Sequence, residues 1–255
     1  MNKNGGVLFD LDGVFYVSNQ AIDGGQKTID LLRKNDIPIR FITNTTTKPR
    51  NIICDKLNTF GLKVYENEMF SASYIGINYL RSIGSPPCHL LIHENIYSDY
   101  AEFEMKNEKP EYVVIGDRGH VWNYDDINQA FNFLKRGAKL ITLHKGKYFQ
   151  TSSGLEIDIG AFVAGLEYSS GKQTISLGKP NPKFFQIALD GMSKKSEEVF
   201  MVGDDIINDI GGAKNIGIKG VLVRTGKFRN SDLFHPDIKP DFIIDSINNL
   251  EAVIQ

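Results

Sequence analysis

The stretch "GGVLFDLDGVFY", residues 5–16, sets the architecture expected for the whole chain. Its apolar run passes into two aspartates, Asp10 and Asp12, which are separated by one leucine and followed by Gly13. A run this apolar is typical of a strand covered on both faces, and we predict a strand over residues 7–12. Side chains alternate along a strand, so the two carboxylates point the same way. Two like charges held this close need a compensating cation.

Short apolar runs alternate with helical patterns through the rest of the chain. This alternation predicts an α/β fold whose parallel strands are joined by right-handed crossovers. The predicted strands cover residues 7–12, 37–44, 89–94, 112–117, 139–144, 197–205, 219–226 and 241–246. The predicted helices lie within residues 24–35, 46–61, 71–81, 125–137, 160–171, 182–192 and 207–217.

Composition excludes several classes of function. The 255 residues carry a formal net charge of −2, so no overall basic field indicates a nucleic-acid partner. No window approaches the roughly eighteen unbroken apolar residues of a membrane span. The start of the chain reads as a direct entry into a strand and not as a signal peptide. Two isolated cysteines, Cys54 and Cys88, fit a reducing compartment, and we expect a cytoplasmic protein.

Polar side chains follow the predicted strands where an open parallel sheet binds its ligands, beyond the carboxyl ends of the strands. Four segments, including a "GKP" and a "GDDIIND", carry such groups: Asp10 with Asp12, Thr43 with Asn44, Lys179, and Asp204 with Asp205 and Asp209. Hard oxygen ligands without a nearby thiolate favour Mg²⁺. The sequence therefore predicts a magnesium site at this edge.

Each segment alone has an ordinary structural explanation. A single aspartate after a strand is usually a turn former or a helix cap, and Lys179 before a proline fits a solvated surface charge. The order and position of the four segments favour chemistry instead. Together they supply a nucleophile, an acid, hydroxyl and amide donors, a fixed cation and a metal anchor, which is the set that phosphoryl transfer requires.

The motifs "DLDGVFY", "TNTTT", "GKP" and "GDDIINDIGGA" resemble, in order, the four motifs of the haloacid dehalogenase (HAD) superfamily. The segments "GAFVAGLEYSSGK" and "GIKGVLVRTGKFR" are similar to its type IIA subfamily, so the resemblance covers nearly the whole chain. It implies a Rossmann-like, doubly wound parallel core formed by residues 1–82 and 174–255. It also implies an inserted, mobile α/β cap domain over residues 83–173.

The resemblance also implies roles for the first two aspartates. Asp10 matches the nucleophile that attacks phosphorus and forms an aspartyl-phosphate. Asp12 matches the general acid/base that protonates the leaving oxygen and then activates water, and its backbone carbonyl is expected to bind the metal. The two carboxylates would thus serve successive halves of one displacement.

The later motifs supply the matching phosphate and metal contacts. Thr43 and the N–H groups around Asn44 would bind the phosphoryl oxygens, and Lys179 would balance the charge of nucleophile and phosphate. Asp204 would bind Mg²⁺ directly together with Asp10. The resemblance leaves open whether Asp205 or Asp209 holds the ion through water or orients its ligands.

We therefore expect a Mg²⁺-dependent phosphatase acting on small phosphorylated metabolites. A 2-haloacid dehalogenase would need neither Asp12 nor the acidic motif. A phosphomutase or another phosphotransferase would need the same residues, so it stays an alternative. A non-catalytic phospho-ligand-binding protein is a further alternative from a different class, although no motif residue is missing.

Substrate choice is expected to follow loops of the inserted segment, 116–122 and 144–151. Candidates there are Arg118, His120, His144 and Lys145, each of which also fits a solvated loop position, so they stay outside the catalytic set. The remaining histidines, His89, His93 and His235, show no metal-ligand spacing. Proteins with this resemblance include homodimers, so a homodimer stays open, although no interface stripe stands out.

Overall fold

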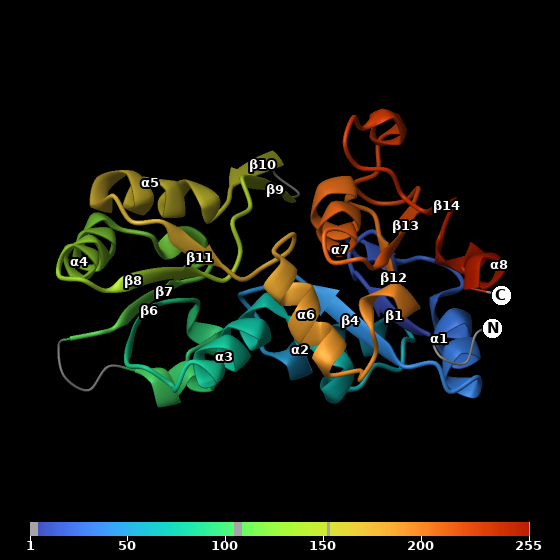
Figure 1. The fold of residues 1–255 in the computed structure, drawn as a ribbon, viewed down its shortest axis with the longest axis horizontal. Coiled ribbons are helices and arrows are strands. Elements are labelled where there is room, and N and C mark those ends of the chain that lie inside the picture. The colour runs from blue at the N-terminus through green and yellow to red at the C-terminus, as the bar shows by residue number, and fades with distance from the viewer. Residues whose placement is uncertain (1–4, 105–108, 152–153, 255) are drawn as a thin grey trace. The chain divides into compact units, whose positions relative to one another are not determined.

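The computed structural model describes residues 5–104, 109–151 and 154–254. They form two compact units. The first contains the residues up to Thr43, Arg50–Phe70 and the residues from Lys179 onward, and the second contains Asn44–Pro49 and Ser71–Gly178. Figure 1 shows a sheet with flanking helices in each unit. Each unit is described by itself below.

The first unit is built on a six-stranded sheet in the order β14-β13-β12-β1-β4-β5. Strand β1 lies between β12 and β4 and is parallel to both, and β13 and β14 continue the parallel arrangement beyond β12. The chain runs outward from β1 through β4 and β5, then returns to β12 on the other side of β1. The strand order thus reverses beside β1, which is where doubly wound sheets bind ligands. The strands span Gly6–Phe9 (β1), Ile39–Thr43 (β4), Met69–Ser71 (β5), Val199–Gly203 (β12), Lys219–Val223 (β13) and Phe242–Ile244 (β14).

Apolar packing holds β1 in the centre of this sheet. All four of its residues are buried, and the Phe9 ring stacks on Phe41 of β4 and meets Phe15 edge-on. Such a strand offers its carboxyl end as a rigid platform for the side chains that follow. A short antiparallel hairpin of β2 (Tyr16–Val17) and β3 (Gln20–Ala21) follows β1. The α-helices of this unit are α1 (Gly25–Lys34), α2 (Arg50–Thr59), α6 (Pro182–Asp190), α7 (Gly212–Lys214) and α8 (Glu251–Ile254).

The second unit has its own parallel sheet, in the order β11-β8-β7-β6. Helices α4 and α5 contribute Leu134 and Val163 to its core, where they cluster with Leu140 of β8. The elements are α3 (Ala72–Ser82), β6 (Cys88–Leu91), β7 (Tyr112–Ile115), α4 (Tyr124–Lys135), β8 (Lys139–Thr142), β9 (Tyr148–Thr151), β10 (Gly154–Ile157), α5 (Gly160–Ser170) and β11 (Thr174–Ser176).

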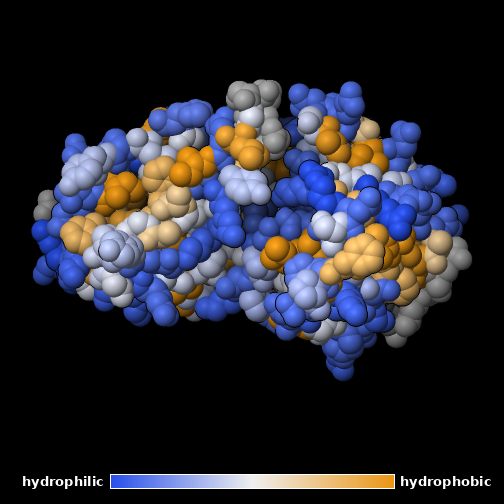
Figure 2. All heavy atoms as spheres, turned by 90° about the horizontal axis from the view of Figure 1, so that it is seen from above, coloured by the Kyte–Doolittle hydropathy of each residue, from blue (hydrophilic) through white to orange (hydrophobic). Residues whose placement is uncertain are grey.

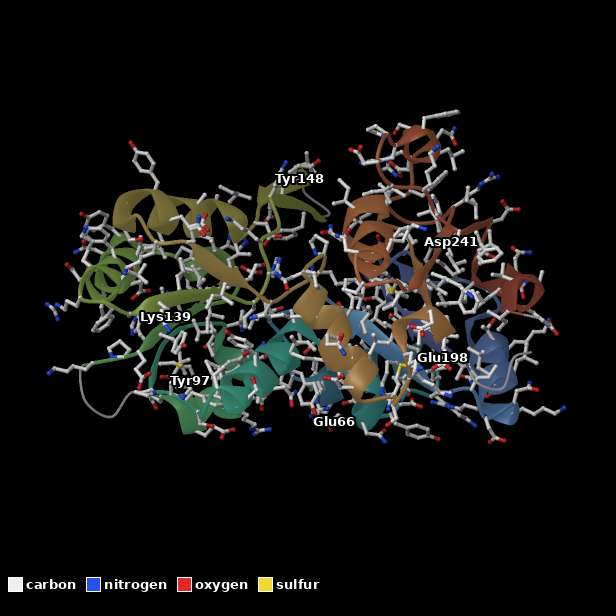
Figure 3. The ribbon with its side chains drawn as sticks, viewed as in Figure 1. Glu66, Tyr97, Lys139, Tyr148, Glu198 and Asp241 are labelled. Carbon is white, nitrogen blue, oxygen red and sulfur yellow. The ribbon has the colours of Figure 1, made fainter. Side chains whose placement is uncertain are left out.

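The predicted α/β class with a doubly wound parallel sheet is confirmed. One local prediction is wrong: the predicted loop over residues 144–151 enters a strand, because β9 pairs with β10 as an antiparallel hairpin. Tyr148, labelled in Figure 3, lies on this hairpin and is 64% exposed. Helix α3 groups with the second unit, since Gly76 lies against the Tyr100 hydroxyl and Leu143. The predicted limits of a cap domain, residues 83–173, stay a prediction.

Surface polarity is mixed. Figure 2 shows a mostly hydrophilic surface on which apolar side chains form separate patches. Within the described residues, no helix combines the length and the apolar character needed to cross a membrane.

Candidate active site

The carboxyl end of β1 places Asp10 at the reversal of the strand order. Its N–H donates to the Val202 carbonyl of β12 at 2.9 Å, which extends the parallel pairing by one residue and fixes the backbone. The Asp10 side chain is almost fully buried, whereas Asp12 is exposed two residues later. The turn closes when the Gly13 N–H donates to the Tyr16 carbonyl at 2.7 Å. The Asp12 carboxylate is therefore more exposed to solvent than that of Asp10, although both residues follow the same strand.

Lys179 is the buried cation of this site. Its residue is 5% exposed, and its ammonium donates to Asp10 Oδ1 at 2.7 Å and to Asp209 Oδ1 at 2.6 Å. Burial alone would lower the pKa of Lys179, but the charges of Asp10 and Asp209 outweigh it and raise that pKa above the usual range. The ammonium is therefore firmly charged.

We expect the "GKP" segment at the end of a strand or at the start of a helix. The strand that precedes it, β11, pairs with β8 in the second unit. Lys179 lies just before α6, whose first turn is capped by the Asn181 side chain. Of the two expected positions, the start of a helix describes Lys179.

Asp205 and Asp209, in the acidic motif after β12, have different structural roles. Asp205 caps the π-helical turn Ile206–Gly211, and its Oδ1 accepts hydrogen bonds from the Ile207 and Asn208 N–H groups at 3.0 and 2.9 Å. Asp209, on that wide turn, is fully buried beneath Gly203 and points at Lys179. Asp205 is thus a helix cap, whereas Asp209 belongs to the buried acidic group around Lys179.

Three buried aspartates form a group that fits a metal ion. Asp10, Asp204 and Asp209 each offer a carboxylate oxygen, and these oxygens lie within 4.8 Å of one another. In the described part of the chain, the buried Asp204 Oδ1 has no hydrogen-bond partner. Three carboxylates against the single buried ammonium of Lys179 leave two negative charges in excess. A divalent cation with oxygen ligands balances this charge, and Mg²⁺ suits the donor set.

The pKa values of the buried aspartates shift in the direction that this excess of negative charge predicts. Burial, followed by the charge of Asp10, raises the pKa of both Asp204 and Asp209. The charge of Asp209 adds to the shift at Asp204, while at Asp209 the charge of Asp205 adds to the shift and Lys179 opposes it. Partial desolvation and the charge of Asp10 likewise raise the pKa of Asp12, although Lys227 opposes the shift. Asp12 is therefore the carboxyl that carries a proton at higher pH than a free aspartate while staying open to solvent.

A loop after β13 completes the site, and none of its residues is among the predicted site residues. The Lys227 N–H donates to Asp204 Oδ2 at 2.6 Å, and the Thr225 hydroxyl donates to the Gly13 carbonyl. Gly13 and Gly226 have φ of 83° and 60°, and a Cβ at either position would overlap the Asp204 carboxylate. The parallel pairing of β12 with β13 predicts that the loop after β13 lies at this edge, and Gly226 marks its turn.

Thr43 ends β4, the other neighbour of β1, and is buried. It groups with the first unit, whereas Asn44 groups with the second. Both stay predicted phosphate contacts.

The four loop residues proposed for substrate choice have acidic partners within the second unit. Arg118 pairs with Asp126, His120 Nε2 lies 3.7 Å from Glu156, His144 Nε2 lies 3.6 Å from Asp158, and Lys145 pairs with Glu167 at 2.6 Å. His144 is buried, unlike a solvated loop residue. The hydrogen-bonded ion pairs of Arg118 and Lys145 explain these two side chains as parts of the local structure, and a role of the four residues in substrate choice stays a prediction.

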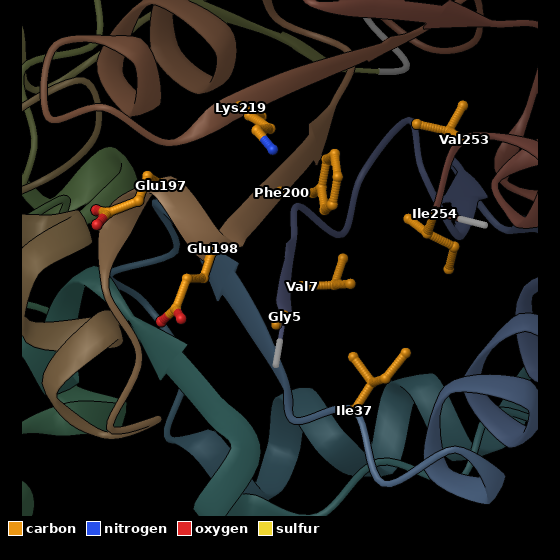
Figure 4. Close-up of a pocket in the computed structure, with 10 residues that line it drawn as sticks. Gly5, Val7, Ile37, Glu197, Glu198, Phe200, Lys219, Val253 and Ile254 are labelled. Carbon is orange, nitrogen blue, oxygen red and sulfur yellow. The ribbon is translucent and has the colours of Figure 1, made fainter. Parts of the chain in front are cut away.

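A pocket of about 220 Å³ lies at the other end of the sheet (Figure 4). Val7 of β1, Phe200 of β12 and Lys219 of β13 line it near the starts of their strands, with Glu197 and Glu198 beside them. Parallel strands place their amino ends away from the edge that carries Asp10 and Asp204. The pocket is therefore distinct from the acidic cluster.

Two protein-family models and curated relatives match this chain. A family model described as haloacid dehalogenase-like hydrolase matches residues 7–106, and a second, described as HAD-hydrolase-like, matches residues 176–250. The phospholysine phosphohistidine inorganic pyrophosphate phosphatase of Rattus norvegicus is 36% identical over 248 residues, which cover 95% of this chain and 91% of that protein.

Solved structures agree over the full length. The p-nitrophenyl phosphatase from Archaeoglobus fulgidus matches with a TM-score of 0.90 and 25% identity, covering 98% of this chain and 99% of that one. The 4-nitrophenylphosphatase from Thermotoga maritima matches with a TM-score of 0.90 and 26% identity, covering 99% and 98%. The order of motifs, the doubly wound sheet and these matches show that the chain belongs to the haloacid dehalogenase-like hydrolase family, as one of its phosphatases.

Proposed function

We propose that the chain is a Mg²⁺-dependent phosphatase that transfers the phosphoryl group of a small phosphorylated metabolite to Asp10 and then to water. The observation that carries the proposal is the buried group of Asp10, Asp204 and Asp209 around the Lys179 ammonium. It stands where the strand order reverses beside β1, with Asp12 two residues beyond the nucleophile.

In the first step, an Asp10 carboxylate oxygen attacks phosphorus and the bond from phosphorus to the leaving oxygen breaks. Asp12 gives its proton to that oxygen, a task for which its raised pKa suits it. Lys179 holds Asp10 in place and offsets part of the charge on the phosphoryl oxygens. The Thr43 hydroxyl is the proposed donor to one of those oxygens.

In the second step, water attacks the aspartyl-phosphate and inorganic phosphate leaves Asp10 free again. Asp12, now ionised, takes the proton from the attacking water. The same carboxyl thus returns to its starting state at the end of each cycle.

Asp10, Asp204 and the Asp12 carbonyl are the proposed Mg²⁺ ligands, and Asp209 helps to orient Asp10 through Lys179. Bound there, the ion would neutralise phosphoryl charge and polarise the phosphorus–oxygen bonds. The Lys227 N–H keeps Asp204 turned toward the site.

The substrate is proposed to be a small phosphorylated molecule. The names of the relatives supply the first panel, which consists of inorganic pyrophosphate, phospholysine, phosphohistidine and p-nitrophenyl phosphate. Phosphoester and phosphoamide bonds both break by displacement at phosphorus, so one site is suited to both.

The test is phosphate release from this panel with and without Mg²⁺, using the wild type and Asp10→Asn. Wild-type turnover should require Mg²⁺, and Asp10→Asn should lose about 10⁴-fold or more because the amide is not a nucleophile. Asp190→Asn is the matched control, since Asp190 is an exposed residue at the end of α6.

Retained turnover in Asp10→Asn would assign the attack to another residue. A wild type that stays inactive on the whole panel at every Mg²⁺ concentration would favour a binding protein. Transfer of the phosphoryl group to a second substrate instead of water would identify a phosphotransferase.

A further inference from the structure

Lys227 places a second cation beside the acidic cluster, and the two steps above give its side chain no task. Its main-chain N–H is bound to Asp204 Oδ2, as described. This contact fixes where the side chain begins but does not involve the ammonium. The ammonium is therefore presented next to the reacting groups from an anchored backbone.

The loop around Lys227 is anchored on both sides. Arg229 Nη1 donates to the carbonyls of Lys227 and Phe228 at 2.9 and 2.8 Å. The Phe228 side chain packs against the apolar cluster of Ile206, Ile210 and Leu222. On the other side, Thr225 is bonded to the Gly13 carbonyl. The fold thus fixes the backbone of Lys227, so ligand binding costs little conformational entropy in this loop.

The ammonium itself is open to solvent. The Lys227 side chain is 69% exposed, and its Nζ forms an ion pair with Asp205 Oδ2 at 3.6 Å, which is beyond hydrogen-bond range. Asp205 already accepts hydrogen bonds from Ile207 and Asn208. Lys179, by contrast, is buried between two carboxylates. Lys227 is therefore the cation of this site that can meet a further anion.

The loop that carries Lys227 lies against the turn that carries Asp12, the proposed donor to the leaving oxygen. The Thr225 hydroxyl donates to the carbonyl of Gly13, the residue after Asp12, and a Cβ on Gly226 would lie 2.5 Å from the Gly13 Cα. A substituent on the leaving group would lie beyond that oxygen, on the same side as Asp12. An anionic substituent there would interact favourably with the ammonium.

We infer that Lys227 is a specificity residue that favours substrates whose leaving group carries its own negative charge, such as a diphosphate. This inference rests on the proposed function, because it places the leaving group by the role of Asp12. A uniform substrate preference would need no such exposed cation, since Lys179 and the metal already meet the transferred phosphoryl group.

The experiment compares wild type, Lys227→Met and Lys227→Arg on pyrophosphate and p-nitrophenyl phosphate with Mg²⁺. All three keep the main-chain N–H on Asp204, so the side chain alone is varied. The ratio of kcat/KM for pyrophosphate to that for p-nitrophenyl phosphate should fall about 10-fold in Lys227→Met, mainly through KM. Lys227→Arg should restore most of it. Lys219→Met, an exposed lysine at the start of β13, should leave the ratio unchanged.

A binding measurement tests the same inference without turnover. The Kd of methylenediphosphonate, measured by calorimetry with Mg²⁺, should rise about 10-fold in Lys227→Met, while that of methylphosphonate should rise at most about twofold. Equal losses for both ligands, or no loss for either, would overturn the inference. A wild type that hydrolyses no member of the panel given above would contradict the proposed function, while the binding comparison would still decide the role of Lys227.

Discussion

At the level of single residues, charge balance decides which groups of the cluster act on a ligand. Lys179 is neutralised by Asp10 and Asp209, so its ammonium holds Asp10, the proposed nucleophile, in place. Asp204 has a buried oxygen without a hydrogen-bond partner among the described residues, so it is the carboxylate with most to gain from a metal. We therefore expect Asp204 to depend more strongly on the proposed Mg²⁺ than its neighbour Asp205, whose carboxylate oxygens already accept hydrogen bonds from Asn208.

The first prediction concerns Mg²⁺ and thermal unfolding. Mg²⁺ should raise the wild-type Tm, because an ion that binds only the folded state stabilises it. At a concentration of about 100 times its Kd, such an ion adds about 2.7 kcal/mol to the free energy of unfolding. Asp204→Asn should lose most of this increase. Asp205→Asn is the control, since asparagine caps a helix as well as aspartate does. A full Mg²⁺ effect in Asp204→Asn would contradict the assignment of this ligand.

The second prediction separates the two steps of the cycle. Asp12→Ala should slow both leaving-group departure and dephosphorylation, by about 10²-fold or more, because one carboxyl serves as acid and then as base. Acid quenching followed by mass spectrometry should find the phosphoryl group on Asp10. Normal hydrolysis in Asp12→Ala would show that the acid/base assignment is wrong.

At the level of elements, the site depends on how closely two turns approach each other. The turn after β1 and the loop after β13 meet around Asp204, and glycine at both contact points leaves room for its carboxylate. Hydrogen bonds from Thr225 and Lys227 close the contact. Adjacent parallel strands thus position the turns, and the lack of a Cβ lets them close.

The third prediction distinguishes this close approach from backbone strain. Gly13→Ala and Gly61→Ala both place alanine at positive φ, 83° and 78°, and both should lose about 1–2 kcal/mol of stability. Only at Gly13 would the new Cβ overlap Asp204, whereas nothing lies within 4 Å of the new Cβ at Gly61. Calorimetric titration should therefore show lost Mg²⁺ affinity in Gly13→Ala alone. Equal Mg²⁺ affinity in the two variants would contradict this account.

Much of this arrangement follows from local sequence patterns. The apolar run before Asp10 and the strands that end near Thr43 and Asp204 were predictable, because buried parallel strands have a distinct composition. The pairing of β11 with β8 was not, since strand partners depend on contacts far along the chain. The different surroundings of Asp205, a helix cap, and Asp209, a buried partner of Lys179, depend on the geometry of a π-helical turn, which single-residue patterns do not reveal.

At the level of the whole molecule, the two units have separate cores and separate sources of stability. The second unit holds His89 on β6, and its ring packs on Phe133 of α4 with centroids 4.9 Å apart. Its Nε2 is buried and has no hydrogen-bond partner within the described ranges. Burial lowers the pKa of His89 from its usual value of 6.5. The imidazole therefore resists protonation in the folded state.

The fourth prediction is a pH dependence confined to this unit. Because the folded pKa of His89 is below 6.5, the unfolded chain binds its proton first as the pH falls. Stability is therefore complete above the unfolded pKa and declines as the pH drops through it. His89→Phe keeps the ring contact and should reduce the fall in Tm between about pH 7.5 and about pH 5.5. Trp122, the single tryptophan, packs on Phe162 in this unit and provides the fluorescence signal.

The control for this prediction is His120→Gln, because the His120 side chain is 91% exposed on the same unit. It should keep the wild-type fall in Tm. If His89→Phe and the wild type lose Tm equally on acidification, His89 does not set the acid sensitivity.

The bond between Lys179 and Asp10 spans 169 positions, and Asp204 follows later still. During synthesis, Asp10, the proposed nucleophile, therefore emerges from the ribosome long before Lys179 and Asp204. Truncated products that end between Asp10 and Lys179 would carry Asp10 without the residues proposed to support its reaction. In a cell-free translation reaction, hydrolysis should begin only when chains that include β12 and the loop beyond β13 emerge, so partial synthesis products cannot consume phosphorylated metabolites.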